Sequence, residues 1–169
     1  MRTRREDLVG ASRTDHTYLV AIGSNQRHQI FGLPREVVAT AMELLHETAG
    51  TVIARSRILN SAPVGPSNRR FANAALLLQT RLKPLSLLAV LHEAEAALGR
   101  RRSGRRWQSR VIDLDIVLWS GGIVAQPDLM VPHPLFRMRE FVLRPSAQVA
   151  PDWRDPLTGR TLQQLAARI

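Results

Sequence analysis

The chain has 169 residues, of which 44% are apolar, and this length and composition suit one globular domain with its own hydrophobic core. It contains no cysteine, which excludes disulfide bonds and thiolate metal sites, and no apolar run approaches the roughly 20 residues that a transmembrane helix needs. The formal net charge is +10, and Lys83 is the only lysine, so arginine carries nearly all of the positive charge. We therefore expect an anionic partner such as a nucleotide, a nucleic acid or a lipid surface.

The N-terminal segment differs in character from the rest of the chain. Residues 1–15 are polar and rich in arginine, and they lack the apolar centre of a signal peptide. We expect them to form a disordered basic arm. Residues 16–169 are then a single domain, and we expect the protein to be cytoplasmic.

The first half of this domain has the pattern of strand, helix, strand. Residues 18–22 are an apolar run that ends in the turn-forming residues 23–25. Residues 34–49 begin with a proline, carry apolar side chains at helical spacing and are followed by a glycine, which predicts a helix. Residues 51–61 are predicted to form a second strand, and the Pro- and Gly-containing residues 62–68 a loop.

The second half repeats this alternation. Residues 71–80 are predicted to form a strand, residues 84–98 a helix that a glycine closes, and residues 111–119 a strongly apolar strand. A hairpin and two short helices are predicted over residues 121–125, 139–149 and 161–169. The order β-α-β-β-α-β predicts an α+β fold, a ferredoxin-like split βαβ sandwich with an antiparallel-dominated sheet and helices packed on it.

Two carboxylates interrupt the apolar strand predicted over residues 111–119. Because side chains alternate between the faces of a strand, Asp113 and Asp115 share one face, roughly 6–7 Å apart. Such carboxylates repel each other unless a cation lies between them, and hard oxygen ligands beside a phosphate substrate are typical of Mg²⁺ sites. The pattern alone is equally compatible with a solvated edge strand whose acids pair with arginines.

A loop with six arginines, residues 100–110, comes directly before this strand. Such a loop can close over a polyphosphate and neutralise the charge that develops in phosphoryl transfer. The chain has no GxxxxGK[ST] motif, so a phosphate site here must rely on arginine forks. Taken alone, the arginine run is more typical of a solvated charged loop or a nucleic-acid patch.

Several other residues are ambiguous by themselves. Glu95 falls on the apolar stripe of its helix, where it needs a partner, either an arginine or a ligand hydroxyl. His133 lies between two prolines, and it could donate to a phosphate or simply be solvated. Phe71 and Phe141 could be core residues or the two sides of a ring sandwich. Asn73 shares a strand face with Phe71, which would suit recognition of the edge of a heterocycle.

The ordered set of these motifs resembles one enzyme family, 6-hydroxymethyl-7,8-dihydropterin pyrophosphokinase. The resemblance runs from about Thr17 to Trp153, most of the chain. The matching pieces are AIGSN at residues 21–25, PVGP at 63–66, FANA at 71–74, Glu95 with LGR at 98–100, RWxxRxxDxDI at 106–116, VPH at 131–133, and Arg139 with Phe141. Each piece is weak by itself, whereas their joint occurrence in this order is specific.

The resemblance implies transfer of diphosphate from ATP to 6-hydroxymethyl-7,8-dihydropterin, with release of AMP, in folate biosynthesis. It implies two Mg²⁺ ions held by Asp113 and Asp115, with Arg100 and Arg110 as the arginines that stabilise charge during transfer. The implied ATP contacts are Glu95, Arg102, Arg110, Ile116, His133 and Arg139. The implied pterin contacts are Ser61, Ala62, Val64, Phe71, Asn73, Trp107, Asp113 and Phe141. A monomer without nucleic-acid or membrane partners is also implied.

Some positions depart from the family pattern. Gln108-Ser109 stands where Gly-Pro is common, and Pro134 stands where an aromatic residue often follows the histidine. Asp128 and Met130 replace a basic and a hydroxyl residue, and Phe71 replaces a frequent tyrosine. These differences bear on ATP affinity and loop kinetics more than on the reaction itself.

Two alternative functions are a single-stranded RNA binder and a degenerate paralogue without activity. A basic ferredoxin-like sandwich could bind single-stranded RNA, but aromatic residues make up only 5% of the chain, no RNP1-like pattern occurs, and paired carboxylates would repel a nucleic-acid backbone. Dependence on Mg²⁺ separates the two functions. A degenerate paralogue that retains the ATP site but has lost the reaction is disfavoured, because every charged position with an implied catalytic role is present.

Overall fold

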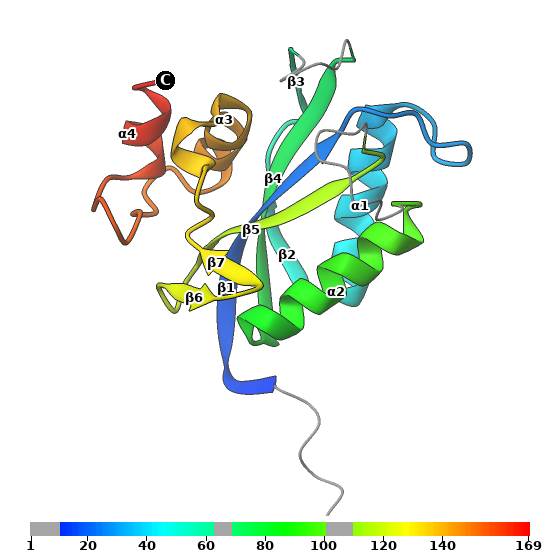
Figure 1. The fold of residues 1–169 in the computed structure, drawn as a ribbon. Coiled ribbons are helices and arrows are strands. Elements are labelled where there is room, and N and C mark those ends of the chain that lie inside the picture. The colour runs from blue at the N-terminus through cyan, green and yellow to red at the C-terminus, as the bar shows by residue number, and fades with distance from the viewer. Residues whose placement is uncertain (1–10, 63–68, 101–109) are drawn as a thin grey trace, which may run out of the picture.

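The computed structural model describes residues 11–62, 69–100 and 110–169, in a layered arrangement of helices and sheet (Figure 1). The elements in chain order are β1 (Ala11–Ser24), α1 (Pro34–Thr48), β2 (Thr51–Arg55), β3 (Leu59–Ser61), β4 (Phe71–Leu82), α2 (Pro84–Ala97), β5 (Asp113–Trp119), β6 (Val124–Gln126), β7 (Leu129–Val131), a 3₁₀ turn η1 (Phe136–Met138), α3 (Glu140–Val149) and α4 (Leu162–Ala166). None of the helices in these ranges is both long and apolar enough to span a membrane.

The main sheet has the strand order β2-β4-β1-β5, and every pairing in it is antiparallel. The short strand β3 continues the pairing of β2 along β4. The helices α1 and α2 connect strands that are separated by one neighbour in the sheet, which is the split βαβ connection. The predicted ferredoxin-like fold class is therefore confirmed.

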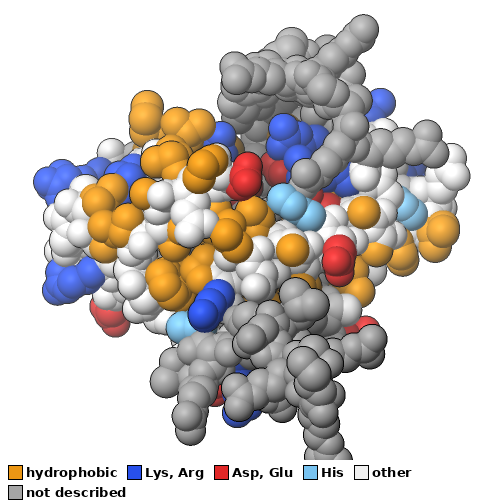
Figure 2. Space-filling view, turned by 60° about the horizontal axis from the view of Figure 1, so that its bottom comes forward, with side chains coloured by type: hydrophobic (Ala, Val, Ile, Leu, Met, Phe, Trp, Pro, Cys, Tyr) orange, Lys and Arg blue, Asp and Glu red, His pale blue; other side chains and the backbone are white. Residues whose placement is uncertain are grey.

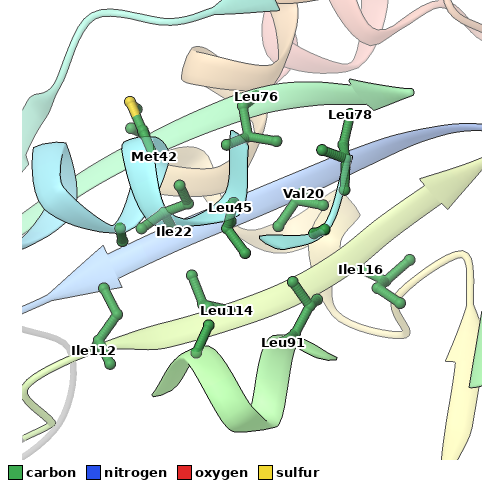
Figure 3. Packing of buried hydrophobic residues seen from close by; sticks show 14 of the residues in the cluster. Val20, Ile22, Met42, Leu45, Leu76, Leu78, Leu91, Ile112, Leu114 and Ile116 are labelled. Atoms are coloured by element: carbon green, nitrogen blue, oxygen red, sulfur yellow. The ribbon is translucent and has the colours of Figure 1, made fainter. Parts of the chain in front are cut away.

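The sheet separates two hydrophobic cores because side chains of a strand alternate between its faces. On one face, Val20 and Ile22 of β1 pack with Leu45 of α1 and Leu91 of α2 (Figure 3). On the other face, β1 contributes residues such as Leu19 to a core with α3 and α4. Figure 1 shows the two helix pairs on opposite sides of the sheet. The central strand β1 is thus buried on both faces and fixes the positions of its neighbours.

The strand β1 begins earlier than predicted. It starts at Ala11, which pairs with Leu82 of β4, and the carboxylate of Asp15 forms an ion pair with Arg81 at 3.3 Å. Residues 11–15 therefore extend the sheet and are not part of a disordered arm. The remainder of the expected arm, residues 1–10, lies outside the described residues.

The single strand predicted over residues 51–61 is interrupted at Ser56. The Ser56 hydroxyl accepts a hydrogen bond from Ala75 N at 2.9 Å and donates to Arg57 O, so a side chain replaces part of the ladder. Arg57 N then donates to Gln148 Oε1 of α3 at 3.0 Å. A tertiary contact with α3 therefore stabilises the break, which is why local sequence patterns do not reveal it.

The predicted hairpin after the fourth long strand has a different partner. A turn does follow β5, where Gly122 N donates to Trp119 O at 3.0 Å. The next strand, β6, pairs with β7 in a separate two-stranded sheet and does not continue the ladder of β5. The prediction of the turn is confirmed, whereas the predicted pairing is wrong.

An ion pair joins the C-terminal segment to the residues before α3. The carboxylate of Asp155 is fully buried and accepts two hydrogen bonds from Arg137, at 2.7 and 2.6 Å. Burial alone would raise the pKa of Asp155, but hydrogen bonds from Arg137, Thr158 and Leu157 N lower it below the usual value. These contacts form only in the folded protein, and together they keep Asp155 in its charged form.

Removing one partner of this pair is expected to be costly. Arg137→Ala leaves the buried Asp155 carboxylate without its counterion, which should lower the free energy of unfolding by about 3 kcal/mol or more, as measured by urea denaturation. Arg144→Ala is the matched control, because it removes an exposed helix pair with Glu140 that contributes about 0.5 kcal/mol or less. Equal costs for the two substitutions would contradict this prediction.

Candidate active site

The candidate site lies on the sheet face that also carries α3. Asp113 and Asp115 occupy this face of β5, because the alternating residue Leu114 points into the opposite core. Gly23 of β1 lies directly opposite both Asp113 and Asn73 of β4, so these three positions form one row across three strands. The predicted metal carboxylates and the predicted pterin amide are therefore two strands apart on one face.

Asp113 is the centre of an arginine network. Its Oδ1 accepts a hydrogen bond from Arg100 Nη1 at 2.7 Å, and its Oδ2 accepts one from Arg110 Nη1 at 2.8 Å. The main chain of Arg110 is fixed in turn, because Arg110 N donates to Asn25 Oδ1 at 2.8 Å and Arg110 O accepts from Asn25 N at 3.2 Å. Both arginines with an implied catalytic role thus contact Asp113. Arg110 is also held by Asn25, which lies far from it in the sequence.

Glu95 connects α2 to this network. Its carboxylate is buried, Oε1 accepts a hydrogen bond from Leu114 N at 2.8 Å, and the same oxygen pairs with Arg100. Its Oε2 is buried and has no hydrogen-bond partner among the described residues. Burial raises the pKa of Glu95, although the Leu114 N–H and the charge of Arg100 oppose this shift. Of the two partners considered for Glu95, the structure shows the arginine, and the nucleotide contact stays a prediction.

Asp115 and His133 face each other on the other side of the site. His133 Nε2 lies 3.9 Å from Asp115 Oδ2, while His133 Nδ1 accepts a hydrogen bond from Leu135 N at 3.2 Å. Burial, together with the positive charge of Arg139, lowers the pKa of His133, so the ring is neutral at pH 7. With Nδ1 acting as acceptor, the proton of the neutral ring is on Nε2, which points toward the carboxylate pair.

Burial also changes the ionisation of Asp115. Burial and the negative charge of Asp113 raise the pKa of Asp115 to about 7, and the charge of Arg139 only partly opposes them. A buried carboxylate beside another negative charge retains its proton near neutral pH when no cation compensates its charge. The Asp113–Asp115 pair therefore has the electrostatic character of a cation site.

This raised pKa predicts a pH dependence of stability in the absence of divalent cations. Between about pH 4 and pH 7 the folded protein retains a proton on Asp115 that the unfolded chain loses, so the free energy of unfolding falls as the pH rises through this window. Solvent reaches 37% of the Asp115 side chain, so screening reduces the size of the effect. Urea denaturation at several pH values should show this decline in the parent and a smaller one in Asp115→Asn. Parallel pH curves would contradict the assignment.

The predicted pterin contacts gather on β3, β4 and α3. Asn73 is buried, and its Nδ2 donates to Ser61 Oγ at 2.8 Å, which fixes the orientation of the amide. Phe71 is the residue directly opposite Ser61 in the β3–β4 pairing and shares a strand face with Asn73. Phe141 lies on α3, where the guanidinium of Arg139 is 5.8 Å from its ring centroid. The amide and the two aromatic rings thus come from elements that pack against each other.

Other predicted contacts are placed differently or lie outside the described residues. The side chain of Ile116 is buried in the core with α1 and α2, on the face opposite the carboxylates, so only its main chain is available to a ligand on the carboxylate face. Ala62 is exposed at the end of a described range. Val64, Arg102 and Trp107 lie outside the described residues. On the face shown in Figure 2, acidic, basic and histidine side chains lie close together.

Comparison with known proteins identifies the family. The model of the family described as 7,8-dihydro-6-hydroxymethylpterin-pyrophosphokinase (HPPK) matches residues 19–151. The chain belongs to this family. It is 40% identical over 150 residues to the 2-amino-4-hydroxy-6-hydroxymethyldihydropteridine pyrophosphokinase of Pseudomonas aeruginosa, with 88% of each chain covered. It is 39% identical over 152 residues to the enzyme of the same name from Methylorubrum extorquens, which covers 89% of this chain and 91% of the relative.

Solved structures show the same HPPK fold. The wild-type HPPK-DHPS of Plasmodium falciparum matches 92% of this chain with a TM-score of 0.73 and 13% sequence identity. The match covers 45% of that longer chain, so the present chain spans less than half of its length. At this identity the likeness shows the fold alone, and it agrees with the ferredoxin-like topology described above.

Two carboxylates of this HPPK family member, Asp113 and Asp115, are the candidate ligands for a metal ion. The described residues contain no group of three or more His, Cys, Asp or Glu side chains arranged to hold an ion. The two aspartates nevertheless suit Mg²⁺, which prefers oxygen ligands and is commonly held by one or two carboxylates together with substrate phosphates and water. The negative charge of Asp113, which helps to raise the pKa of Asp115, agrees with a place for a cation at this pair.

Two residues that make structural contacts, Asn25 and Asp155, were not identified from the sequence. Asn25, quoted only as part of a motif, holds the main chain of Arg110. Asp155 anchors Arg137, which lies between His133 and Arg139 in the chain. An asparagine after a strand and an acidic residue near the C-terminus carry no local signal for these contacts, because both depend on pairing between distant segments.

Proposed function

We propose that this HPPK family member transfers the terminal diphosphate of ATP to 6-hydroxymethyl-7,8-dihydropterin in folate biosynthesis. The observation that carries the proposal is the placement of three groups on one sheet face: the Asp113–Asp115 pair, the arginines bonded to Asp113, and the Asn73 amide fixed by Ser61. The groups that we propose to bind phosphate and the group that we propose to bind the heterocycle share this face, which suits a reaction between ATP and a pterin.

The reaction balances without a strong base. The pterin hydroxyl oxygen forms a bond to the β-phosphorus of ATP, the bond from that phosphorus to the oxygen bridging to the α-phosphorus breaks, and AMP leaves with that oxygen, while the hydroxyl proton passes to solvent. Positioning and charge neutralisation provide most of the catalysis in phosphoryl transfer. Asp113 and Asp115 would hold two Mg²⁺ ions, which would supply charge neutralisation and lower the pKa of the coordinated hydroxyl.

The side chains of the protein have separate parts in this scheme. Arg100 and Arg110 place two fixed positive charges beside Asp113, where transferred phosphoryl oxygens gain negative charge. Neutral His133 presents its Nε2–H as a hydrogen-bond donor to a phosphate oxygen, and Arg139 adds a positive charge beside it. Asn73 orients the heterocycle through its amide, and Phe71 and Phe141 provide apolar ring faces.

The decisive experiment identifies the nucleotide product. Purified protein is mixed with ATP, Mg²⁺ and 6-hydroxymethyl-7,8-dihydropterin, and the nucleotides are separated by chromatography. AMP that forms only when the pterin and Mg²⁺ are both present supports the proposal. ADP would mean that a single phosphoryl group moves, bound ATP without product would indicate a degenerate paralogue, and no ATP binding would favour the RNA-binding alternative.

The proposal includes a monomeric state and a cytoplasmic location. The monomeric state rests on the family resemblance. Size-exclusion chromatography with light scattering tests the first, because a monomer has the 18.9 kDa mass of one chain.

A further inference from the structure

A glycine lies at the centre of the row that joins the two ends of the site. Gly23 is paired with Asn73 of β4 on one side and with Asp113 of β5 on the other. Residues directly opposite each other in antiparallel strands share a face. Two strand spacings separate Asn73 from Asp113, roughly 9–10 Å, and the direct path between them crosses Gly23.

The backbone of Gly23 does not require a glycine. Its φ angle lies outside the positive range that the structure assigns to Gly32, Gly50 and other turn glycines, so residues with a side chain can adopt its conformation. Glycine within a strand weakens the strand, because it has more conformational freedom to lose and no side chain to pack. A glycine in the central strand therefore carries a cost that local conformation does not explain.

The limited space beside Gly23 on the face of the site explains why a glycine is present. A Cβ atom added to Gly23 would lie 3.3 Å from Asn73 Oδ1, closer than ordinary van der Waals contact, and the amide could make room only by shifting. Asn73 is 4% exposed and its Nδ2 is bonded to Ser61 Oγ at 2.8 Å, so a shift would disturb that bond. The added methyl group would also stand on the path between the amide and Asp113.

The nearest position of β1 on this face is also small. In the next row, Ala21 lies between Ala75 and Asp115 and presents only a methyl group. On the opposite face the same strand carries the larger side chains of Val20 and Ile22 in the core. Next to the site, β1 therefore carries only Ala21 and Gly23 on this face, whereas Leu19, farther along the same face, packs in the core with α3 and α4.

We infer that Gly23 is a specificity-determining residue of the pterin site. Its missing side chain keeps the Asn73 amide in place and leaves the surface between Asn73 and Asp113 free. A planar heterocycle whose edge is held at Asn73 can then lie against the sheet and present its hydroxymethyl arm to Asp113. This inference rests on the proposed function, since it takes the pterin to bind at Asn73 and its hydroxyl group to reach Asp113.

The test is Gly23→Ala. We expect the KM for 6-hydroxymethyl-7,8-dihydropterin to rise about tenfold or more, the loss typical of one obstructing carbon in a fitted pocket. The dissociation constant of a non-hydrolysable ATP analogue should change less than about twofold. The melting temperature should change little, because the restriction of the unfolded chain by alanine and the close contact with Asn73 Oδ1 oppose each other. Gly23→Val should weaken pterin binding further.

Ala21→Gly is the matched control, because it changes one methyl group on the same face of the same strand. It is expected to lower the melting temperature and leave the pterin KM within about twofold of the parent. An unchanged pterin KM in Gly23→Ala, or an equal loss of pterin and nucleotide binding with a lowered melting temperature, would overturn the inference. If the parent protein itself neither binds the pterin nor forms AMP, the proposed function fails instead.

Discussion

Asp115→Asn is expected to lower kcat for diphosphate transfer at least about 10³-fold while the protein remains folded. The substitution retains the shape of the side chain and removes one of the two carboxylates that would hold Mg²⁺. Loss of several kcal/mol of charge stabilisation corresponds to this factor, because each 1.36 kcal/mol is tenfold in rate. Steady-state formation of AMP at saturating substrates measures it.

A matched control and a stability measurement complete this test. Asp152→Asn makes the same change of charge at an exposed position near the C-terminus and is expected to retain parental activity. Because the pKa of Asp115 is raised, its ionised form opposes folding without a cation, so Asp115→Asn should be at least as stable as the parent at pH 7. Near-parental turnover of Asp115→Asn would refute the assignment of this carboxylate to the metal.

The second large effect is expected from Arg110→Ala. The Arg110 guanidinium is held beside Asp113 by its own hydrogen bond and by the clamp that Asn25 forms on its main chain. A fixed donor of this kind acts mainly on charge that develops in the transition state, and removal of one such donor costs about 10²–10³ in kcat. We expect that loss, with less than about a fivefold change in the dissociation constant of an ATP analogue measured by calorimetry.

Two other substitutions define the role of Arg110. Arg110→Lys retains the charge but loses the planar fork, so it should recover only part of the activity. Arg168→Ala removes an exposed arginine near the C-terminus and should leave kcat unchanged. If Arg110→Ala weakened nucleotide binding as much as turnover, its part would be ordinary ground-state binding.

The sequence predicted those parts of the structure that depend on local periodicity. The alternation along β5 correctly placed Asp113 and Asp115 on one face, because a strand has a period of two wherever it lies in a sheet. The helices that begin at Pro34 and Pro84 were predicted because proline suits the first helical position. The order of these elements was sufficient to predict the ferredoxin-like topology.

Features that depend on contacts between distant segments were not predicted. The break at Ser56 is stabilised by Gln148 of α3, and the hairpin pairing of β6 depends on β7. For Glu95, the helical stripe indicated that a partner was needed but could not say which one. The choice of Arg100 and Leu114 N depends on how α2 packs against β5. Such contacts are properties of the assembled fold.

The two arginines on Asp113 have a consequence for how a cation arrives. Both oxygens of this carboxylate are already engaged, one by Arg100 and the other by Arg110. Each oxygen retains a further lone pair, so a divalent ion at Asp113 would either bind beside the two arginines or take the place of one of them. An arginine displaced in this way would retain its charge and would be available to phosphate oxygens that arrive with the ion. In the second case, binding of a metal–nucleotide complex would exchange counterions, with the metal on the aspartate and the phosphate on the arginine.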